Sequence, residues 1–174
     1  MSSEMRHHPF TESTIRHFQK RHERPLSQET ENRNHPVIFE TLLSYLRVEI
    51  EEMEETKKEK MEHLVQEMEQ AAFRYIESRV EFFRQAMANG KSERREDLKI
   101  IENVDRNRRL AHIRLVDSVR IACRNVVQET GIFLPEKFSL LVGSGEDHAT
   151  RERVARAVID YTWKLLEQDL EEAA

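Results

Sequence analysis

The chain has 174 residues, of which 38% are hydrophobic and 35% charged, with only four Gly and four Pro. That length suits one domain with a real core, and the scarcity of Gly and Pro favours helices. No apolar run approaches the roughly 18 residues of a membrane span, so we expect no membrane association. The single cysteine, Cys123, excludes an internal disulfide and favours a reducing cytoplasm.

Residues 1–36 are polar and hold five of the eight histidines and three of the four prolines. We expect a flexible N-terminal arm here. The alternative is a short helix in which Phe10, Ile15 and Phe18 dock on the rest of the protein. A di-iron bundle requires two histidines that each have Glu three residues before them, and only His7 does, so we expect no metal and no cofactor.

A long helix is predicted for residues 37–89, because its apolar residues recur at intervals of three and four. The stripe turns polar at Thr56–Lys60, where a break is the alternative. Asn89 and Gly90 both tolerate the left-handed conformation that often ends a helix, so we expect the helix to end there.

Two further helices are predicted for about 92–130 and 147–171. Ser92 is a plausible cap for the first and Gly131 its stop, while Ser144 and Asp147 resemble a capping box before the second. The fold class is therefore all-α. We expect a long helical hairpin of residues 37–89 and 92–130, with the C-terminal helix packed on its apolar end, as a single domain over 37–174.

The first helix of this hairpin is longer than the second and leaves residues 37–55 without an obvious partner inside the chain. The apolar residues of this leftover seam are Phe39, Leu42, Leu43, Leu46, Ile50 and Met53. We expect the seam to bind another helix in a coiled coil, either of a second copy or of a partner protein.

Charge is unevenly distributed along the chain. Residues 37–90 carry a net charge of −5, and residues 91–131 carry +3. An acidic helix followed by a basic one is typical of an antiparallel hairpin with complementary faces. Nucleic-acid binding is possible but not favoured, because the basic block is modest and faces acidic residues of the same chain.

A polar interruption stands in the apolar stripe of the second helix, at Asp105, Arg108 and His112, with Arg109 beside it. A charge turned toward a core is costly unless it is paired. One interpretation is structural, with Glu67 or Glu69 facing Arg108 and fixing the register of the hairpin. The other is functional: His112 exchanges protons near neutral pH, Arg108 holds an anion and Asp105 orients them.

The pair Arg106-Asn107 followed by His112 is similar to the Arg–x(4–6)–His motif of HEPN-type ribonucleases. Those proteins are all-α, dimerise and cut RNA. The resemblance implies that His112, with Arg106 or Arg108, would be catalytic, that RNA would be the substrate and that no metal would be needed.

Residues 97–165 carry a second resemblance. Asp105, the Arg108-Arg109 pair, His112 and Gly131, followed by Arg151 and Val154-Ala155, look like a family of small helical proteins of bacteria and their phages. That family has no assigned activity, so the resemblance implies a compact all-α domain and nothing about chemistry.

Together these patterns favour a non-enzymatic interaction or regulatory protein of the bacterial cytoplasm, acting as a homodimer or with a protein partner. The alternative is a metal-independent ribonuclease.

Overall fold

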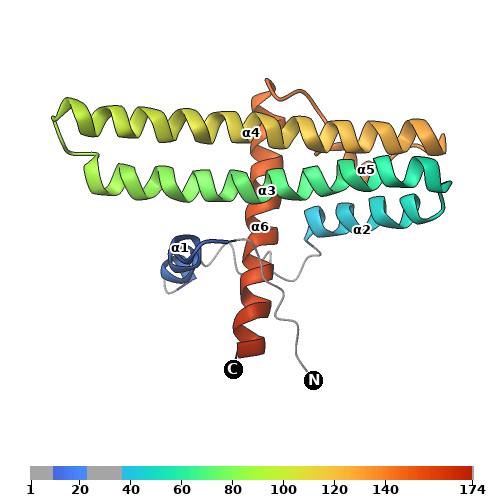
Figure 1. Ribbon diagram of the computed structural model, residues 1–174, viewed down its shortest axis with the longest axis horizontal. Helices are drawn as coiled ribbons and strands as arrows, with labels where there is room; N and C mark the ends of the chain where they lie inside the picture. The colour runs from blue at the N-terminus through green and yellow to red at the C-terminus, as the bar shows by residue number, and fades with distance from the viewer. Residues whose placement is uncertain (1–9, 23–36, 174) are drawn as a thin grey trace.

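The computed structural model describes residues 10–22 and 37–173, with side chains at 10–18 and 37–168. Within these residues the protein consists of helices and turns, and none of them forms a strand, so the predicted all-α class is confirmed (Figure 1). The helices are α1 (Glu12–His22), α2 (Ile38–Glu51), α3 (Glu55–Asn89), α4 (Arg95–Thr130), α5 (Glu136–Ser139) and α6 (His148–Ala173).

Helices α3 and α4 form the predicted antiparallel hairpin, which is the longest dimension of the molecule (Figure 1). Three contacts between the helices fix its register: an ion pair of Lys57 with Glu129 at 3.0 Å, stacking of Tyr75 on His112, and Arg108 over the ring of Phe82. This register places Met87, near the end of α3, level with residues 99–103 of α4 and Leu98 level with the end of α3.

The predicted single helix over 37–89 is wrong, because the chain turns back at 52–54, a few residues before the expected break. Helix α2 lies alongside the first half of α3 (Figure 1), and Arg47 of α2 pairs with Glu69 of α3 at 2.8 Å. The apolar stripe is thereby folded onto itself. The buried residues of α2 face a core that includes buried residues of α3, namely Met61, Val65, Met68 and Ala72.

The seam that was expected to lack a partner therefore lies inside the chain's own core. Phe39, Leu42, Leu43, Leu46 and Ile50 are buried and Met53 is half-buried. The prediction erred because it assumed that residues 37–55 extend beyond the reach of the second helix. They return over the hairpin instead, so this surface is not available to a partner.

Helix α6 was expected to cover one end of the hairpin. It crosses the hairpin near its middle instead (Figure 1). Its apolar side includes Val154 and Val158, both buried. Tyr161 packs on Phe39 of α2 with ring centroids 5.2 Å apart, and Lys164 forms an ion pair with Glu40. One helix thus joins α2, α3 and α4.

The turn residues act partly as the sequence predicts. Gly131 ends α4 in the left-handed conformation, with φ of 69°, as expected. Gly90 follows α3 but keeps a right-handed helical φ of −66°, so the expected left-handed stop is wrong there. At α6 the cap is Asp147, whose carboxylate accepts hydrogen bonds from the backbone N–H and the hydroxyl of Thr150.

Part of the segment predicted to be a flexible arm is ordered. Residues 12–22 form α1, as in the alternative expectation, and Phe10 and Phe18 are buried against the core. The carboxylate of Glu77 on α3 accepts three hydrogen bonds at the start of α1, from the backbone N–H and hydroxyl of Thr11 and from the hydroxyl of Thr14. The prediction for 1–9 and 23–36 concerns residues outside the described ones.

Candidate functional site

The polar residues singled out on α4 form a small ion cluster along one side of the helix. Asp105 accepts a hydrogen bond from the guanidinium of Arg108 at 2.7 Å and pairs with Nε of Arg109 at 3.3 Å. These pairs are three and four residues apart, the spacings at which helical side chains meet. All three lie on one helix, and the single carboxylate offsets one of the two positive charges, which leaves the cluster with a net charge of +1.

Arg108 is held mainly by contacts that the sequence did not reveal. Its guanidinium lies 4.7 Å from the ring centre of Phe82 on α3, and its Nε is buried without a hydrogen bond. The predicted partners are engaged elsewhere, because Glu67 pairs with His63 and Glu69 with Arg47. From α3, Arg108 therefore meets the face of an aromatic ring in place of the expected carboxylate, while Asp105 of its own helix supplies the negative charge.

His112 lies where α3, α4 and α6 meet. Its ring stacks on Tyr75 of α3 with centroids 4.8 Å apart, and its Nε2 is 2.8 Å from the backbone carbonyl oxygen of Arg151 in α6. A carbonyl oxygen can only accept, so the proton of the neutral ring is on Nε2 and His112 is the donor. One half-buried side chain therefore ties the beginning of α6 to the hairpin.

The electrostatic surroundings of His112 favour its neutral form. Burial lowers the pKa of the imidazole below its ordinary value of 6.5, and the positive charges of Arg151, Arg108 and Arg79 lower it further. The hydrogen bond to the Arg151 carbonyl opposes these effects and raises the pKa. A neutral, stacked and hydrogen-bonded imidazole is suited to holding two helices together.

The structure does not bring together the pair required by the ribonuclease resemblance. Helix α4 is continuous from Arg95 to Thr130, so residues 106 and 112 point about 120° apart around it. Arg106 is exposed to solvent, whereas His112 is directed toward α3 and α6. Arg108, the other candidate, is occupied by Asp105 and Phe82.

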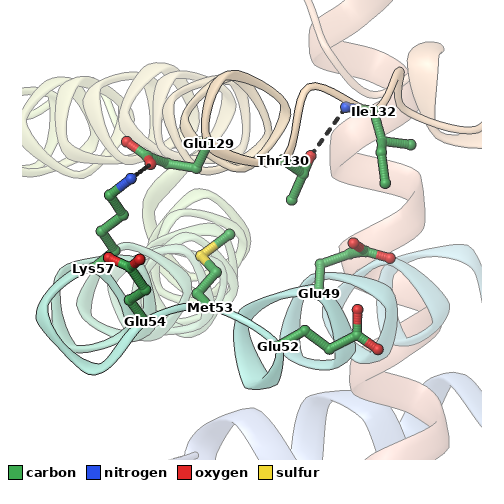
Figure 2. A pocket seen from close by; sticks show the side chains of 8 residues that line it. All are labelled: Glu49, Glu52, Met53, Glu54, Lys57, Glu129, Thr130 and Ile132. Atoms are coloured by element: carbon green, nitrogen blue, oxygen red, sulfur yellow. Dashed lines mark hydrogen bonds and ion pairs between the residues drawn. The ribbon is translucent and has the colours of Figure 1, made fainter.

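A hollow of about 340 Å³ lies at the end of the hairpin where α4 terminates, between that end and the turn from α2 to α3. Figure 2 shows Met53 in its floor, between the Lys57–Glu129 ion pair and the carboxylate of Glu49. Its other lining residues are Glu52, Glu54, Thr130 and Ile132. The hollow combines an apolar floor with an acidic rim.

The opposite end of the hairpin exposes apolar residues. Along the core-facing stripe of α3, Val80 is buried and Phe83 half-buried, while Met87 is 85% exposed. Leu98, in the first turn of α4, is 45% exposed. Neither α2 nor α6 reaches this end of the hairpin (Figure 1), and α1 contacts it at Phe83, whose ring stacks on His17, so the stripe becomes exposed beyond Phe83.

Sequence reasoning found the ion cluster but missed the residues that complete it. The spacing of Asp105, Arg108 and Arg109 along one helix is visible in the sequence. Tyr75, Phe82 and the Arg151 carbonyl become neighbours only once the register of α3 and the crossing of α6 are fixed, and no local pattern specifies either. The exposure of Met87 was missed for the same reason.

Comparisons of the chain with known protein families, with curated proteins and with solved structures find no match. Both resemblances noted from the sequence therefore stay predictions. In the described part of the chain, no helix is long and apolar enough to span a membrane. Among the same residues, no three or more His, Cys, Asp or Glu side chains gather closely enough to hold a metal ion.

Proposed function

We propose that this protein is a non-enzymatic helical interaction protein that self-associates through the free end of its hairpin. This end, residues 79–109, is called the arm below. The observation that carries the proposal is the exposure of the arm's core-facing stripe, above all of Met87 and Leu98.

The position of these residues distinguishes them from ordinary exposed hydrophobics. Val80, about two turns before Met87 on the same stripe, is buried, and Leu115 on the matching stripe of α4 is also buried. Met87 and Leu98 thus continue the apolar stripe of the core beyond the point where other helices cover it. A stripe of this kind is stabilised when a helix of another molecule covers it.

The ion cluster supports this proposal because its side chains connect helices of the hairpin. Asp105 and Arg108 hold the arm's two helices in register through Phe82, and His112 fixes the arm's base to α6. Side chains engaged in this way position the arm as a rigid projection rather than line a cleft. A rigid projection loses little conformational freedom when it binds.

The test compares two leucines of the same helix. Leu98 and Leu110 are 45% and 46% exposed, but only Leu98 lies in the stripe opposite the end of α3. We expect Leu98→Gln to weaken self-association about tenfold or more, since it removes roughly one buried leucine side chain per contact. Sedimentation equilibrium of both variants at several concentrations measures this effect.

Leu110→Gln is the matched control and should associate as the parent does. Equal association constants for the parent, Leu98→Gln and Leu110→Gln would contradict the role of the arm. A parent that remains a 20.7 kDa monomer at every concentration would contradict self-association itself.

A further inference from the structure

The two ends of the hairpin carry opposite charge. The arm, residues 79–109, has nine Lys or Arg and six Asp or Glu, a net charge of +3. The other end, residues 47–69 and 118–139, is called the open end here. It has seven Lys or Arg and eleven Asp or Glu, a net charge of −4.

The side chains responsible for this difference are free to meet a partner. On the arm, Lys91, Arg95, Lys99 and Arg106 are exposed and form no ion pair with any described residue. On the open end, Glu49, Glu52 and Glu54 at the hollow likewise form no ion pair with a described residue (Figure 2). Glu93 and Glu102 on the arm and Lys60 and Arg124 on the open end are also exposed, but each end keeps an excess of one sign.

Both ends also expose apolar side chains beside these charges. The arm carries Met87 and Leu98. At the open end Ile132, which lines the hollow, is 54% exposed and the neighbouring Phe133 is 90% exposed. A surface with apolar residues at its centre and charges around them resembles the usual anatomy of a protein interface.

From this complementarity we infer that the arm of one copy docks on the open end of a second copy. The inference rests on the proposed function and names the surface that covers the arm. Charge selects this arrangement over the pairing of two arms, because two surfaces of +3 repel each other whereas +3 and −4 attract.

The rod shape of the hairpin allows this contact to form twice. With two copies antiparallel about a two-fold axis, each arm lies on the partner's open end. The contact is then isologous and the assembly closes as a dimer. In this dimer the leucine and methionine of each arm lie over the partner's hollow, with Arg95 and Lys99 near its carboxylates.

Reciprocal charge reversal in the full-length chain tests the inference. One variant carries Arg95→Glu and Lys99→Glu, and the other carries Glu49→Lys and Glu52→Lys. Each variant alone places like charges opposite each other at the substituted positions in both contacts of the dimer, so we expect each to sediment as a monomer at low salt. Mixed in equal amounts they restore attraction at both contacts, and a heterodimer of twice 20.7 kDa should form.

Arg153→Glu with Arg156→Glu is the control for the arm variant, since these exposed arginines of α6 lie on neither end and their replacement makes the same change in net charge. We expect this variant to dimerise as the parent does. A mixture that stays monomeric while the parent dimerises would overturn the inference.

The outcomes separate the inference from the proposed function. If Leu98→Gln abolishes the dimer but the reversed variants do not rescue each other, the arm associates with a different surface and only the inference fails. If the parent never dimerises, both fail. Circular dichroism of each variant establishes that the helices are retained.

Discussion

The imidazole of His112 binds α6 to the hairpin in its neutral form, so the stability of the protein should depend on pH near this group. The folded state holds the His112 proton less tightly than the unfolded chain, whose pKa is about 6.5. As the pH falls through that value, the unfolded chain takes up the proton first. The stabilising effect of His112 is complete above pH 6.5 and decreases below it.

Thermal unfolding of the parent and His112→Leu at several pH values measures this effect. At pH 8 we expect the variant to lose about 1–3 kcal/mol, because one hydrogen bond and one stacking contact are removed. The difference in Tm should shrink as the pH decreases from 7 to 5. A difference that grows toward low pH would mean that the folded state prefers the charged imidazole.

Cys123 is buried in α4, and burial raises the pKa of its thiol to about 12. The reactive thiolate is therefore scarce at neutral pH and shielded from reagents. We expect an aromatic disulfide reagent to label Cys123 rapidly in guanidinium chloride and orders of magnitude more slowly in the native protein. Immediate stoichiometric labelling of the native protein would contradict the packing of this helix.

The sequence predicted which polar side chains of α4 interact, but it did not predict most of the groups that they contact. The pairing of Asp105 with Arg109 was expected from their spacing and is confirmed. The partners of Arg108 and His112 were not, because Phe82 and the Arg151 carbonyl are brought in by other helices. Local spacing specifies contacts within a helix and says little about contacts between helices.

Helix α1 is held by the buried Phe10 and Phe18 and, at its beginning, by one carboxylate of α3. Glu77 receives the backbone N–H and hydroxyl of Thr11 at 2.7 and 2.9 Å, beside the positive end of the helix dipole, and the hydroxyl of buried Thr14 at 2.9 Å. Glu77→Ala should therefore release α1 without unfolding the hairpin. Hydrogen exchange should accelerate in residues 12–22 and remain unchanged in α4.

Glu81→Ala is the control for this prediction, because Glu81 lies on the same helix but bonds only to Arg84 and Gln85 of α3. Equal exchange in α1 for both variants would show that Glu77 does not hold it.

Helix α2 is a core element, so its leucines should report on stability and not on association. Leu46 is fully buried, and Leu46→Ala should cost about 2–5 kcal/mol and lower Tm by roughly 10 °C. Val48 is 60% exposed on the same helix, and Val48→Ala should change stability by about 0.5 kcal/mol or less. A Leu46→Ala variant that unfolds like the parent but loses its dimer would restore the seam as an interface.

The ends of α4 and α6 were predicted within a few residues, whereas the turn between α2 and α3 was placed inside a longer helix. Residues 52–54 contain neither Gly nor Pro, and the apolar stripe continues across them. A periodic apolar stripe indicates that one side of a helix is buried. It does not indicate whether another molecule or the next segment of the same chain covers that side.

The shape of the whole molecule follows from that fold-back. Helices α2 and α6 cover one half and the middle of the hairpin, α1 contacts the arm at Phe83, and the rest of the arm projects beyond them (Figure 1). Interaction was predicted from the sequence for residues 37–55, and the exposed stripe lies instead at Met87 and Leu98. The predicted seam is covered within the chain, and the exposed stripe was not predicted, because its location depends on which half of the hairpin α2 covers.

Self-association through this arm is the central claim, and the mass of the parent protein in solution tests it most directly. Sedimentation equilibrium at micromolar concentration and low salt should give twice 20.7 kDa. At about 1 M salt, where charge interactions are screened beyond roughly 3 Å, the dimer should weaken markedly. A single species of 20.7 kDa under both conditions and at every concentration would contradict the account.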